Sequence, residues 1–171
     1  MELLIPGLVI VALMVWASTK IKRNAARAFD AEEIHGDGFT LDKPEGFLSR
    51  VESPDGHLFD AYSKDFGTGS AENLRAATAV VFSSDNTINE AASLEQSRLT
   101  NSERSELFEL GGSHCIIVTG EAVHDDHTFN VSEKILTLDG HTLVLKIDVL
   151  KERSDEFARK TEDMLISFNP R

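Results

Sequence analysis

The first 27 residues constrain this chain most, because an apolar segment is followed at once by a basic cluster. Residues 1–17 carry one charged side chain, Glu2, whereas residues 18–27 carry four Lys or Arg and no acid. Segment 3–21 approaches the length of about 20 residues that an α-helix needs to cross a bilayer. The pattern predicts a single N-terminal transmembrane helix, which makes the rest of the chain a tethered domain.

Three alternatives fit this segment less well than a retained anchor. A buried core helix would tolerate the length, but a start this apolar, with no polar face, suits lipid better. A cleavable signal peptide usually has a basic n-region, and here that region carries only Glu2. An interfacial amphipathic helix needs a polar face, which this segment lacks. Trp16 stands where an interfacial aromatic residue is expected. We therefore expect residues 1–29 to form a transmembrane anchor that continues into a basic juxtamembrane helix.

The basic residues predict on which side of the membrane the domain lies. Lys20, Lys22, Arg23 and Arg27 all follow the apolar segment, and positively charged flanks of membrane helices stay in the cytoplasm. We expect a single-pass protein of a bacterial inner membrane with a cytoplasmic domain. The only cysteine, Cys115, agrees with this siting because no internal disulfide is possible.

The charge of the domain limits its partners. From Asp30 onward the chain has 13 Lys and Arg against 28 Asp and Glu. Such an acidic domain is repelled by phosphate backbones and by anionic lipid headgroups. The sequence therefore predicts no nucleic-acid partner. It predicts contact with the lipid bilayer through residues 3–21 alone, and an integral-membrane protein as the partner.

The remaining residues divide into a linker and one domain. Residues 30–38 are acidic, end in Gly-Asp-Gly and are typical of a linker. Residues 39–171 have a length that suits one compact domain. Alternating apolar residues and turn signals predict strands at 39–42, 57–64, 76–82, 106–110, 115–123, 129–138 and 142–150.

Two helices accompany these strands. Thr87 and Glu90 form a capping-box pattern that opens a helix to about Leu99. A second helix is expected from Ser154, with an apolar stripe that includes Phe157 and Met164. Hairpin-linked strands with helices between and after them predict an α+β fold, in which helices cover an antiparallel sheet.

Several segments together resemble the PsbP-like superfamily, which includes extrinsic subunits of the plant oxygen-evolving complex and related bacterial domains. They are an opening strand that runs into Pro-x-Gly-Phe at 44–47, GGSHCIIVTGEAV at 111–123, a hairpin around 139–140 and KTEDMLISFNP at 160–170. The resemblance covers about residues 38–169. It implies an α/β/α-type sandwich around an antiparallel sheet and a binding or assembly role. It assigns no functional residue.

One short segment has the residue types of a metal site. His124, Asp126 and His127, with Glu121 upstream, supply imidazole and carboxylate groups of the kind that bind zinc. Asp-Asp between two strands is also ordinary hairpin-turn chemistry. Both interpretations stay open at the level of sequence.

The function predicted from these features is that of a membrane-anchored, non-enzymatic binding or assembly module. It would be an accessory subunit of an integral-membrane complex, and no cofactor is expected. The alternatives are a membrane-tethered metal-dependent hydrolase that uses the hairpin at 121–127 and a small-ligand carrier.

Overall fold

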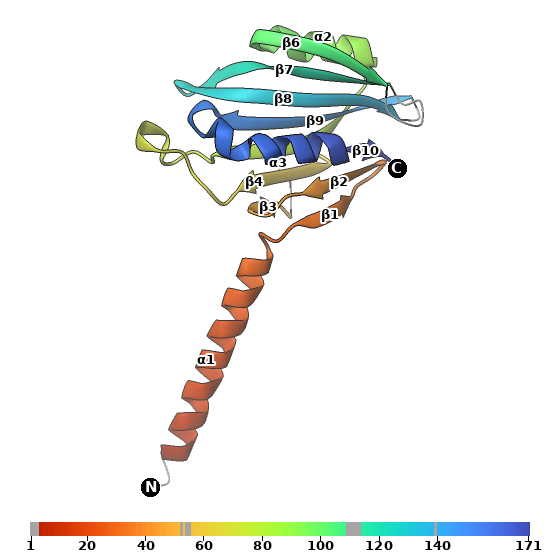
Figure 1. Ribbon diagram of the computed structural model, residues 1–171. Coiled ribbons are helices and arrows are strands. Elements are labelled where there is room, and N and C mark those ends of the chain that lie inside the picture. The colour runs from red at the N-terminus through yellow and green to blue at the C-terminus, as the bar shows by residue number, and fades with distance from the viewer. Residues whose placement is uncertain (1–3, 52, 54–55, 109–113, 139) are drawn as a thin grey trace.

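The structure of the chain is a computed structural model that describes residues 4–51, 53, 56–108, 114–138 and 140–171. Figure 1 shows one long N-terminal helix, α1 (Leu4–Arg27), projecting from a layered domain of helices and strands. Within α1 the described side chains are those of residues 9–22 and 27.

A seven-stranded sheet forms the centre of the domain, and every neighbouring pair of its strands is antiparallel. In spatial order the strands are β3 (Phe47–Ser49), β4 (Phe59–Ser63), β5 (Ala77–Ser84), β9 (His141–Leu150), β8 (His127–Leu138), β7 (His114–His124) and β6 (Thr100–Phe108). Strands β6, β7, β8 and β9 follow one another along the chain and pair as consecutive antiparallel neighbours, as the sequence predicts. The prediction of an α+β fold with an antiparallel sheet is confirmed.

The two faces of this sheet are buried by different elements. On one face, Leu145 and Ile147 of β9 join a large core with Phe157 and Met164 of helix α3 (Ser154–Ser167). On the other face, Val144 joins a smaller core under helix α2 (Ile88–Arg98). Successive residues of a strand point to opposite faces, so α2 and α3 lie on opposite sides of the sheet. Short 3₁₀ turns at Gly69–Ala71 and Lys151–Arg153 complete the connections.

Helix α2 begins with the predicted capping box. The Thr87 backbone amide donates to Glu90 Oε2 at 3.0 Å, and the Glu90 amide donates to Thr87 Oγ1 at 3.4 Å. This reciprocal pair satisfies two amide groups that a helix N-terminus otherwise leaves without intrahelical acceptors.

A second sheet of three strands lies beside α3, and it corrects the expectation that residues 30–38 form a linker. Its order is β1 (Glu32–His35), β2 (Phe39–Lys43) and β10 (Asn169–Pro170). Residues 30–38, expected as a linker, thus contain a strand that makes four residue pairs with β2. The stretch reads as a linker because its stability comes from pairing with β2 and not from its own apolar pattern.

Helix α1 is continuous through the region expected to join an anchor to a juxtamembrane helix. In the part of the chain whose side chains are described, no helix combines the length and the apolar character needed to cross a membrane. The first residues of the predicted anchor, 1–8, lie outside those described side chains.

The capping box gives a test of α2. Replacing Thr87 by Ala removes the acceptor for the Glu90 amide, and an N-cap of this kind contributes about 1 kcal/mol. We expect urea unfolding to show a loss of that size, whereas Glu90→Gln keeps the box and changes stability little. A Thr87→Ala chain as stable as the parent would mean that packing alone holds α2.

Candidate functional site

The residues predicted to bind metal lie at the tip of the β7–β8 hairpin. His124 and His127 form its last cross-strand pair. Asp125 and Asp126 between them have φ of 49° and 65°, a left-handed conformation that Asp tolerates in tight turns. Among the residues that the structure describes, no three His, Cys, Asp or Glu side chains are grouped so that they could hold a metal ion.

Glu121, the upstream carboxylate of that prediction, is directed away from the two histidines. It lies an odd number of residues before His124 on β7 and so faces the opposite side of the sheet. Its Oε1 accepts a hydrogen bond from Lys151 Nζ at 2.7 Å. The His124 ring instead packs near Phe129, with 5.8 Å between ring centroids. The hairpin therefore brings the imidazoles together but not this carboxylate.

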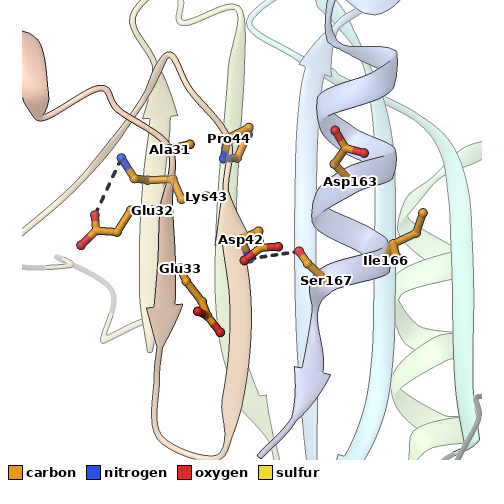
Figure 2. A pocket seen from close by; sticks show the side chains of 9 residues that line it. All are labelled: Ala31, Glu32, Glu33, Asp42, Lys43, Pro44, Asp163, Ile166 and Ser167. Carbon is orange, nitrogen blue, oxygen red and sulfur yellow. Dashed lines mark hydrogen bonds and ion pairs between the residues drawn. The ribbon is translucent and has the colours of Figure 1, made fainter.

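A groove of about 490 Å³ lies between the β1–β2 pair and the last turns of α3 (Figure 2). Its lining residues are Ala31, Glu32, Glu33, Asp42, Lys43, Pro44, Asp163, Ile166 and Ser167. The Asp42 amide donates to Ser167 Oγ at 3.0 Å and connects the two walls. The groove is rich in carboxylates, and Ile166 on its α3 side is 66% exposed.

Lys43 differs from the other charged residues of the groove because only 2% of it is exposed. Its Nζ donates to the backbone carbonyls of Ala28 at 3.2 Å, Asp30 at 2.8 Å and Phe47 at 2.9 Å. The Glu32 carboxylate lies 3.9 Å away and is largely solvated. A buried ammonium is costly unless its donors are used, and here three backbone carbonyls accept from it.

These contacts attach the end of α1 to the domain. Ala28 and Asp30 belong to the segment that leaves α1, and Phe47 begins β3. The Gly46 amide adds a 2.7 Å hydrogen bond to the Phe29 carbonyl. We call Lys43 and these backbone partners the junction clamp. It ties the helix to the domain more firmly than a flexible linker could.

A second buried polar cluster lies under α2. Glu133 of β8 is fully buried, and Glu95 of α2 is 4% exposed. Lys146 Nζ lies 3.7 Å from Glu133 Oε1 and 4.0 Å from Asp148 Oδ1. Arg98 Nη1 donates a hydrogen bond to Glu95 Oε1 at 2.8 Å. No described N–H group donates a hydrogen bond to either Glu133 oxygen, and the side-chain hydrogen bond that acts on Glu133 is with the Glu95 carboxyl group.

The surroundings of Glu133 shift its protonation. Burial, followed by the negative charge of Glu95, raises the pKa of Glu133 to about 8, although Lys146 opposes the shift. Burial also raises the pKa of Asp148 above its ordinary value. Glu133 therefore carries its proton at neutral pH.

Sequence reasoning identified neither Lys43 nor Glu133 as a buried polar group. Lys43 reads as part of the Lys-Pro-Glu-Gly turn. Glu133 has a clearer signal, because it replaces an apolar residue in the inward series Val131, Glu133 and Ile135. Cys115 is buried in the larger core, as expected from its apolar neighbours.

The junction clamp can be tested by substitution. Lys43→Met keeps the apolar stem but leaves three carbonyls without their donor. We expect urea unfolding to show a loss of roughly 2–3 kcal/mol, because hydrogen bonds to charged groups contribute about 1.5–3 kcal/mol. The exposed Lys64→Met is the control. Equal stability of the two variants would contradict the clamp.

Comparison with known proteins yields structural relatives only. No protein-family model and no curated protein sequence matches the chain. Among solved structures, cyanobacterial PsbP (CyanoP) from Synechocystis superimposes with a TM-score of 0.57 at 13% identity, over 84% of this chain and 94% of that one. LpqN, described as involved in cell envelope biogenesis of Mycobacterium tuberculosis, superimposes with a TM-score of 0.57 at 16% identity, over 82% of this chain and 90% of that one.

A Bacteroides thetaiotaomicron protein gives a TM-score of 0.54 at 13% identity, over 84% of this chain and 49% of that one. At identities this low, structural similarity establishes the fold and does not transfer activity or partners. The predicted resemblance is thus confirmed at the level of architecture. The domain of this chain has a PsbP-like fold.

Proposed function

We propose that this chain is a membrane-tethered, non-enzymatic binding module that serves as an accessory subunit of an integral-membrane complex. The observation that carries the proposal is the apolar surface of α1. Its described side chains from Val9 to Lys22 are all exposed. Its large apolar residues, each more than half exposed, are Val9, Ile10, Val11, Leu13, Met14, Val15, Trp16 and Ile21.

An apolar surface of this size is more stable when it is buried away from water. Burial of a large apolar side chain is worth about 1.5–3 kcal/mol, so a helix that exposes eight of them favours a lipid or protein environment. The basic end of the helix suits the membrane interface. Lys20 Nζ lies 5.1 Å from the centre of the Trp16 ring, and aromatic and basic side chains are typical of that level.

The charges on the two sides of the junction support a cytoplasmic domain in an inner membrane. Lys20 and Lys22 follow the apolar residues of α1, and positive flanks favour the cytoplasm. The domain beyond them is acidic. Anionic headgroups therefore attract the end of the helix and repel the domain, which leaves the domain free to contact protein.

The junction clamp and the acidic groove suggest what that protein is like. Lys43 ties the domain to the end of α1 and also lines the groove, so the groove lies close to the helix. Cytoplasmic loops of integral-membrane proteins are enriched in Lys and Arg. A groove with Glu32, Glu33 and Asp163 complements such loops, whereas it repels nucleic acid.

Membrane extraction tests the tether. We expect the full chain to stay in the membrane pellet after alkaline carbonate washing, and a chain that begins at Ala28 to be soluble. The shorter chain keeps Ala28 and Asp30 for the clamp and is the matched control. Release of the full chain by carbonate would contradict the tether.

Reporters fused after Arg171 test the side of the membrane. We expect a reporter that works only in the cytoplasm to be active and one that needs the periplasm to be inactive. The reverse result would overturn the cytoplasmic siting while leaving the tether intact.

Mild-detergent extraction tests the assembly role. We expect the extracted chain to migrate in native electrophoresis with an integral-membrane protein. Glu32→Lys together with Glu33→Lys should weaken that association, whereas Glu45→Lys outside the groove should not. Migration as a free monomer from freshly extracted membranes would contradict the assembly role.

A further inference from the structure

The polar cluster under α2 has a structural consequence separate from the proposed tether. Glu133 lies on β8, opposite Val118 of β7 and Lys146 of β9. It occupies the face whose apolar residues Ile116, Val118, Ile135 and Val144 pack against α2. A fully buried carboxyl group, which the carboxyl group of Glu95 meets from α2, is therefore placed directly beneath a helix.

The neighbouring groups leave one charge unbalanced when Glu133 ionises. Glu95 and Arg98 face the cluster from α2, Lys146 and Asp148 from β9, and Arg104 lies on the same face of β6. Arg104 already donates hydrogen bonds to the side chains of Glu106 and Asn89. After Lys146, His124 is the next group that lowers the pKa of Asp148 and so opposes the effect of burial. An ionised Glu133 would thus meet two carboxylates and share Lys146 with one of them.

We infer that Glu133 is a proton-operated latch for α2. Its protonated form lets α2 lie on the sheet, and its ionisation favours release of α2 and hydration of the cluster. Release would expose the apolar face formed by Ile116, Val118, Ile135 and Val144. Figure 1 shows α2 beside β6, the strand at one edge of the sheet. The apolar core under α2 is separate from the core under α3, so opening of α2 leaves the α3 core in place.

The direction of the pH dependence follows from proton binding. In the closed state the pKa of Glu133 is about 8, whereas its ordinary value is 4.5. The closed state therefore binds more protons than the open state between these values, so rising pH favours opening. Opening increases by up to about tenfold per pH unit in this window. It levels off above about pH 8, and below about pH 4.5 there is no further effect.

Amide hydrogen exchange of the full chain in mild detergent tests the latch. Exchange rates of α2 (Ile88–Arg98) and α3 (Ser154–Ser167), divided by the intrinsic chemical rate at each pH, give the opening constants. We expect the α2 constant to rise by a hundredfold or more between about pH 5 and pH 8, and the α3 constant to change much less. Glu133→Gln should abolish the α2 rise, whereas the exposed Glu45→Gln should keep it.

Three results would overturn the latch. They are an α2 opening constant that does not change with pH, a slope that persists in Glu133→Gln, and equal slopes in α2 and α3, which would indicate global unfolding. If Glu133→Gln does not fold, the Glu133 carboxyl can be titrated in the parent chain by carbon-detected NMR. Ionisation near the ordinary pKa of a glutamate would then contradict the inference, and ionisation near pH 8 with a rising α2 constant would support it.

Discussion

The domain depends on burial of both faces of its central strands. In β9 the four residues Thr142–Leu145 are all buried, and Ile147, Val149 and Leu150 are buried as well. A strand with two buried faces requires cover on each side. Helix α3 with the small sheet supplies one cover and α2 the other, and each has its own apolar core. The arrangement of the helices follows from this requirement.

Local sequence patterns predicted the strands and helices whose own residues show alternation, turn residues or a capping box. The hairpins of β7, β8 and β9 follow from alternation and turn residues, and α2 follows from Thr87 and Glu90. Strands β1, β3 and β10 were not predicted, because they are only four, three and two residues long and too short to show an alternating pattern. Lys43 and Glu133 were missed for a related reason. Their roles depend on partners that only the fold brings close. The metal site predicted at His124, Asp126 and His127 is a separate case, because among the described residues no three possible ligands are grouped to hold a metal ion.

Two buried ionisable side chains distinguish the ends of this domain. At the end near α1, Lys43 is satisfied by three carbonyls and fixes the junction with the helix. Under α2, burial and the nearby Glu95 raise the pKa of Glu133 to about 8, so Glu133 keeps its proton at neutral pH. The first arrangement favours rigidity and the second permits local opening.

The single tryptophan of the chain, Trp16, tests the tether most directly because it lies within α1. Its fluorescence can be measured in vesicles that contain brominated lipids, with aqueous iodide as a second quencher. We expect strong quenching by lipids brominated near the headgroup and protection from iodide, since Trp16 lies at the basic end of the apolar segment. Full quenching by iodide, with no effect of brominated lipid, would contradict membrane insertion of α1.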